Sequence, residues 1–183
     1  MRAGRLRHHV SIIELSHQLA PIAIGSAWTS IVAKDSAEAP AASGLRTGAK
    51  VTVRARFSSQ LQQGVYLRHQ NRLFHVTSSR DVMGTRSELV LTCDEFVGTD
   101  AVYYPAGEPP IQCRVHLMHG APYLDDFGKV TSYQTKAEVL LIEVGRPQEN
   151  DRIQVNGVMF IVTQYASDTD DGVVRGLWLD PME

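Results

Sequence analysis

The sequence predicts an all-β protein made of two tandem small β-barrel or sandwich domains. Three observations predict this: short alternating strands, the lack of a convincing long amphipathic helix, and a segment repeated about 86 residues apart. The motif Phe-x-Val-Thr occurs at Phe74–Thr77 and again at Phe160–Thr163. A turn containing Asp and Gly follows each copy, and then an arginine and an apolar strand. A repeat of this length fits a small domain, because solenoid units are shorter.

Strand patterns follow one another at short spacing in the first half of the chain. The expected strands are, in order, 9–14, 27–33, 51–57, 65–68, 73–78 and 87–93, with a loop at 15–26. Alternation is clearest in the third strand, where Val51, Val53, Ala55 and Phe57 are expected to face the core. About six short strands at regular spacing favour a small barrel or sandwich.

Residues 34–50 differ in composition from the strands around them. Lys34–Gly44 is small and polar, with one proline and one glycine. This composition predicts a long loop, or a short helix that is broken near Pro40.

Residues 98–110 form the predicted linker, because Pro105, Gly107, Pro109 and Pro110 are concentrated there. The first domain is therefore expected at 1–97 and the second at 111–183. In the second domain we expect a turn-rich loop at 119–128. The strands expected there are 111–118, 136–144, 153–155, 158–165 and 173–179.

Charge is distributed unevenly between the two halves. Residues 1–97 carry 12 Lys or Arg and 7 Asp or Glu, a net of +5, whereas residues 98–183 carry 6 and 13, a net of −7. A chain with one basic and one acidic half suits head-to-tail association with like copies, or contact with two different partners. The alternative is solvated surface whose charges happen to segregate.

The sequence contains no motif that indicates a metal, a cofactor or catalysis. His8 and His9 are adjacent, so on a strand they point to opposite faces. Asp168–Gly172 resembles only part of a calcium loop and is expected to be a turn. Cys93 and Cys113 lack metal-ligand spacing and are expected to be buried free thiols. No apolar run approaches the ~20 residues of a membrane span, and no secretory signal is evident.

Five segments of the first half carry a resemblance to a known family. They are Gly4–Ile12, Ala27–Ala33, Val51–Arg56, Arg72–Val76 and Arg86–Cys93. In this order and spacing they resemble the head–tail joining proteins of tailed bacteriophages, the small head-closure or stopper proteins. The second half is similar to a small barrel of the phage connector or tail-attachment kind, on the pattern Asp151-x-Ile153-x-Val155-x-Gly157-x-x-Phe160-x-Val162. Typical members of the joining family have one such domain. The extra domain therefore leaves open which position this chain occupies in the connector.

The resemblance implies a structural, non-catalytic protein of the virion neck, assembled in the host cytoplasm. Such proteins form a ring, here a hexamer or dodecamer, beneath the portal or adaptor. The ring retains the packaged double-stranded DNA and offers a docking surface to a tail-terminator or tail tube protein. An adaptor or a tail-completion protein is the nearest alternative. A barrel that binds single-stranded nucleic acid is a more remote one, because Phe57, Tyr66 and Phe74 lie near arginines, although alternation assigns Phe57 and Phe74 to the core.

Two sets of residues are the expected contact sites. Those expected to contact DNA or the portal are Arg2, Arg5, Arg7, Arg54 and Arg56. Those expected in a loop that enters the channel are Lys34, Asp35, Glu38, Pro40, Gly44 and Arg46. The alternative for the arginines is charge that keeps strand edges from aggregating.

Overall fold

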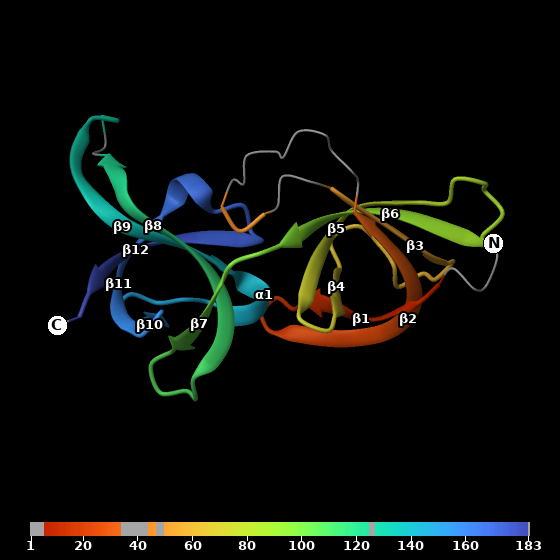
Figure 1. The fold of residues 1–183 in the computed structure, drawn as a ribbon, viewed down its shortest axis with the longest axis horizontal. Helices are drawn as coiled ribbons and strands as arrows, with labels where there is room; N and C mark the ends of the chain where they lie inside the picture. Colours follow the sequence, from red (N-terminus) through yellow and green to blue (C-terminus); the bar gives the residue numbers. More distant parts are fainter. Residues whose placement is uncertain (1–5, 34–43, 47–49, 125–126, 183) are drawn as a thin grey trace. The chain divides into compact units, whose positions relative to one another are not determined.

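A computed structural model of the chain describes residues 6–33, 44–46, 50–124 and 127–182. The chain divides into two compact units, Met1–Val97 and Gly98–Glu183. Each unit contains a closed six-stranded barrel (Figure 1). The prediction of an all-β fold with two tandem small domains is therefore confirmed.

The first barrel is built from antiparallel pairs only. Its strands are β1 (His8–Leu15), β2 (Pro21–Ala33), β3 (Val51–Arg56), β4 (Tyr66–His69), β5 (Arg72–Arg80) and β6 (Glu88–Phe96). Their order around the barrel is β1-β2-β3-β6-β5-β4, and β4 pairs with β1 to close it. The predicted loop at 15–26 is shorter than expected, because β2 begins at Pro21. Proline is tolerated at the first residue of a strand.

The second barrel repeats this order. Its elements are β7 (Thr99–Tyr104), β8 (Ile111–Leu124), β9 (Val130–Leu140), α1 (Leu141–Val144), β10 (Arg152–Val155), β11 (Val158–Ala166), a 3-10 turn (Ser167–Thr169) and β12 (Val174–Pro181). The strand order is β7-β8-β9-β12-β11-β10, closed by pairing of β10 with β7. The expected strand at 136–144 thus ends at Leu140 and continues as one helical turn.

Strand β7 lies within residues 98–110, the predicted linker. It pairs with both β8 and β10. The proline-rich part that follows is also held, because the buried Asp151 carboxylate accepts hydrogen bonds from the Tyr103 hydroxyl and from the backbone N–H of Ala106 at 3.0 Å. Burial and this hydrogen bond raise the pKa of Tyr103. The stretch is therefore part of the second barrel.

Strand β8 also extends further than predicted, through the expected loop at 119–128 to Leu124. Its register with β9 shifts between Met118 and Ala121, and Gly120 has a φ of 68° at this point. Glycine takes this left-handed conformation without a steric penalty, so the strand passes through the irregularity and continues.

The two barrels share local detail as well as strand order. The register of β5 on β6 shifts between Val76 and Ser78, and that of β11 on β12 shifts between Val162 and Gln164, 86 positions later. At each shift a threonine hydroxyl donates to a backbone carbonyl of the facing strand: Thr77 to Thr92 at 3.0 Å and Thr163 to Trp178 at 3.2 Å. The hydroxyl supplies a donor where the bulge interrupts the ladder.

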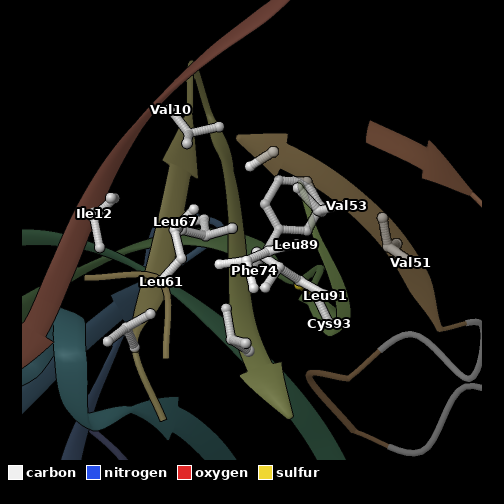
Figure 2. Packing of buried hydrophobic residues seen from close by; sticks show 13 residues of the cluster. Val10, Ile12, Val51, Val53, Leu61, Leu67, Phe74, Leu89, Leu91 and Cys93 are labelled. Atoms are coloured by element: carbon white, nitrogen blue, oxygen red, sulfur yellow. The ribbon is translucent and has the colours of Figure 1, made fainter. Parts of the chain in front are cut away.

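Each unit has its own apolar core. The first is drawn from β1, β3, β4, β5, β6 and the segment between β3 and β4 (Figure 2), and partly buried residues of β2 pack against it. It consists of Val10, Ile12, Val51, Val53, Ala55, Leu61, Val65, Leu67, Phe74, Val76, Leu89, Leu91 and Cys93. The second consists of Ala101, Tyr103, Cys113, Val115, Ala137, Val139, Val144, Ile153, Val155, Phe160, Val162, Leu177 and Leu179.

Both cysteines are buried free thiols, one in each core. Desolvation is the main cause that raises the pKa of Cys93 and of Cys113 to about 12 in each case. At pH 8 the reactive thiolate is thus on the order of one part in ten thousand.

We therefore expect neither cysteine of the folded chain to react with a maleimide or a disulfide reagent at pH 8. Denaturant should expose each thiol as its own barrel unfolds, because unfolding removes the burial that raised the pKa. Mass spectrometry of labelled peptides separates the two sites. Rapid labelling of Cys113 before any loss of β-sheet circular dichroism would contradict the burial of that thiol.

Candidate interaction surfaces

The outward face of the first barrel carries an arginine cluster. Arg54 and Arg56 are exposed on β3, as the alternation of that strand predicts. Arg54 lies opposite Val90 of β6, and Val90 lies opposite the exposed Arg80 of β5. Glu88 of β6 is 3.5 Å from Arg54 and faces Arg56 across the sheet. Arg7 is exposed just before β1, and Arg2 and Arg5 lie outside the described residues.

Most of the expected channel loop lies outside the described residues. This applies to Lys34, Asp35, Glu38 and Pro40, and to residues 34–43 and 47–49 of the loop or short helix expected at 34–50.

The described end of that segment is anchored to β6. Leu45 is fully buried and its carbonyl accepts a hydrogen bond from the Val97 N–H at 2.8 Å. Arg46, which follows, forms a bridge to Phe96, and its Nε lies 3.7 Å from the buried Asp94. Lys50 also contacts that carboxylate. Arg46 therefore lies against the barrel, beside Gly44 at a φ of 71°.

An aromatic groove lies beside the arginine cluster. A row of outward residues crosses β1, β2, β3 and β6. His9 of β1 lies opposite Trp28 of β2. Arg56 is on the neighbouring β3, and Glu88 of β6 lies opposite it. Trp28 is 58% exposed, and the His9 ring lies against its ring at a centroid distance of 5.2 Å. We call this the Trp28 groove. It is lined by Leu6, Ser26, Ala27, Trp28, Arg56, Phe57 and Ser58.

Phe57 lines this groove instead of the core, so the prediction that it faces inward is wrong. It is 39% exposed, and the Arg86 guanidinium lies 5.8 Å from the centre of its ring. Strand β3 ends at Arg56, so the alternation that predicted an inward Phe57 stops one residue too early. Phe74 and Tyr66 are buried, which leaves Phe57 as the exposed member of the three aromatics considered for nucleic-acid stacking.

The second barrel carries a projecting hairpin. Residues 136–139 of β9 pair with both β8 and β12, and Thr135 pairs with β12. Val130, Ser132, Tyr133 and Gln134 pair with β8 alone. We call residues 121–124 and 127–134 the arm; Figure 1 shows it extending away from the rest of its barrel. Its outer side chains are apolar and exposed: Phe127 at 95%, Tyr133 at 73%, and also Leu124 and Val130.

The base of the arm is fixed to the barrel by Tyr123. Its ring lies edge-on to Trp178 at 5.2 Å, and its hydroxyl donates to Gln164 Oε1 at 2.8 Å. The Lys136 ammonium lies 5.7 Å from the Trp178 ring and 2.7 Å from Asp168. An isolated two-stranded hairpin is marginally stable in water, so these contacts are what hold the arm in one direction.

The carboxylates of the turn at Asp168–Gly172 bind other groups of the second unit. Asp168 contacts Lys136, Asp170 contacts Arg175 at 2.8 Å, and Asp171 accepts hydrogen bonds from the backbone of Val173 and Val174. In the part of the chain that the structure describes, no group of three or more His, Cys, Asp or Glu could hold a metal ion. The same residues include no helix of sufficient length and apolarity for a membrane span.

Two family models match the chain, and together they cover both barrels. The phage head completion protein family matches residues 1–95, and the phage Head-Tail Attachment protein family matches residues 80–179. These matches span 95 and 100 of the 183 residues, more than half of the chain in each case. The chain belongs to the phage head–tail joining proteins. Neither the curated proteins nor the solved structures gave a match.

The resemblance read from the sequence is thereby confirmed for this head–tail joining protein. The surface residues that the sequence missed are Trp28, Phe57, Arg80 and Arg86, together with the arm. Arg80 follows the bulge in β5, where the inward and outward positions no longer follow a simple alternation. The arm was not predicted because Gly120, Pro122 and the sequence Asp125-Asp126 are typical of a loop.

Replacing Tyr123 with alanine should release the arm without unfolding the barrel. The substitution removes the ring that packs on Trp178 and the hydroxyl that binds Gln164. Amide hydrogen exchange should become faster in residues 118–134 and stay unchanged in β10, β11 and β12. Tyr133→Ala is the matched control, because Tyr133 lies on the same arm and is exposed. Equal protection of the arm in both variants would contradict the role given to Tyr123.

Proposed function

We propose that this head–tail joining protein forms a ring in the virion neck, between the portal or adaptor and the tail. The ring closes the DNA-filled head and presents the surface on which the tail-terminator or tail tube protein docks. The observation that carries the proposal is the division of the two family matches: head completion on the first barrel and head–tail attachment centred on the second. The role is structural and requires no catalysis. Assembly takes place in the host cytoplasm.

A ring is supported by the different net charges of the two units. The first unit carries +5 and the second −7 by sequence. Rings form from heterologous contacts that close by rotation, and such contacts join two different patches of the same chain. Opposite net charges on two units favour this kind of contact over pairing of like with like.

The internal repeat suggests a copy number. Six chains with two barrels each supply twelve barrels, which would adapt a twelvefold portal to a sixfold tail. A ring of twelve chains, or barrels at unrelated radii, would contradict this. The count comes directly from an electron cryomicroscopy map of the neck.

Filled heads that lack the protein should lose their DNA and fail to join tails. Adding the purified chain to such heads should restore both properties, and a map of the restored neck should place it between portal and tail. Heads that retain DNA and join tails without the chain would overturn the proposal. An adaptor role would appear as a direct contact with the portal, and a tail-completion role as attachment to free tails.

The arginine cluster is proposed to contact the packaged DNA through phosphates. Arg54 and Arg80 project from neighbouring parts of one face, and each neutralised phosphate releases counterions. The double variant Arg54→Ala/Arg80→Ala should lower affinity for double-stranded DNA. The slope of log affinity against log salt should fall in magnitude by about 2. Arg146→Ala/Arg152→Ala, two exposed arginines of the acidic unit, is the control. Equal slopes for the two variants would rule out this contact.

A further inference from the structure

We propose that the arm of one chain inserts its apolar tip into the Trp28 groove of the next chain, and that this contact joins copies head to tail. The inference rests on the proposed ring and names the surfaces that form it. The occupant of the groove is therefore a second copy of this chain.

The tip has the chemistry of an anchor. Phe127 and Tyr133 are the most exposed aromatic side chains of the second unit's described part, at 95% and 73%, and Leu124 lies near them on β8. Large exposed apolar side chains gathered on one projection are typical of a protein-binding site. Tyr123 and Trp178 hold the base of the arm, which reduces the entropy lost when the tip is bound.

The groove has the complementary chemistry. Trp28 and Phe57 provide apolar walls, and Arg56 provides a positive charge beside them. Leu6 and Ala27 extend the apolar lining. Aromatic side chains and arginine are the residue types most enriched among the few that dominate binding energy at interfaces.

Charge selects a second copy as the occupant. The arm belongs to a unit whose net charge by sequence is −7. The groove lies in the unit of net charge +5, and Arg54 and Arg86 lie near it. Every copy therefore carries an apolar arm on its acidic unit and an aromatic groove on its basic unit, as a head-to-tail contact requires.

The two surfaces can be tested separately by substitution in the full chain. Phe127→Ser removes the anchor and Trp28→Ser removes a groove wall. Each should raise the concentration needed for self-association about tenfold or more in analytical ultracentrifugation. Met83→Ser is the control, since Met83 is 74% exposed in the first unit and lies outside the groove. Unchanged association in both variants, or a wild-type chain that stays monomeric at its solubility limit, would overturn the proposal.

Crosslinking tests which chain supplies the arm. Chains with Phe127→Cys should crosslink to chains with Trp28→Cys through a short bifunctional maleimide, while the wild type should not, because Cys93 and Cys113 are buried. Crosslinking only within a chain that carries both substitutions would show that the arm binds its own groove. Crosslinking only between two Phe127→Cys chains would show arm-to-arm pairing. Either result overturns the head-to-tail contact.

Three further outcomes relate this inference to the proposed function. If both variants assemble normally and still restore filled heads, the ring stands and this contact is wrong. If Trp28→Ser leaves self-association unchanged but weakens binding of a single-stranded oligonucleotide, the groove binds nucleic acid and the proposal is overturned. If the variants fail to assemble and fail to restore heads while the control does both, the contact and the ring are supported together.

Discussion

Closure of each barrel depends on one short antiparallel contact. In the first unit β4 pairs with β1 through Ser11 with Arg68, Ile12 with Leu67, and Ile13 with Tyr66. In the second unit β10 pairs with β7 through four residue pairs. The short strand is positioned by the tight turn that joins it to the next one, with a φ of 53° at Gln70 and 51° at Asn156. Without this contact the sheet would have two open edges, which invite pairing with other chains.

The same framework carries different surfaces in the two units. Position 28 in the first barrel is the exposed Trp28, whereas position 114, 86 residues later, is Arg114, which binds Glu143 at 2.9 Å. Position 65 is the apolar Val65, whereas position 151 is the buried Asp151, which holds the turn after β7. The backbone bulges and their threonine hydroxyls stay the same. Side chains have therefore diverged where the ladder does not constrain them.

Much of this architecture could be predicted from the sequence, because closed barrels depend on alternation and turns. The pattern of Val51, Val53 and Ala55 predicted inward positions correctly, and all three are buried. It failed at Phe57 because side-chain direction no longer alternates once the strand has ended. Residues 98–110 were predicted as a linker because their prolines and glycine are apparent in the sequence, whereas the Asp151 carboxylate that accepts their hydrogen bonds lies in a distant part of the chain. The groove could not be predicted, since the exposure of Trp28 depends on packing between strands. The arm was expected as a loop with exposed aromatics, and its strand pairing was not predicted.

Only Val97 and Gly98 separate the end of β6 from the start of β7. Because both barrels belong to one polypeptide, their stoichiometry is one to one, whatever each of them binds. When a partner binds one barrel, the short connection holds the other barrel near the same site at a high effective concentration. A weak partner for the second barrel then suffices, because that second step no longer depends on diffusion of a separate protein.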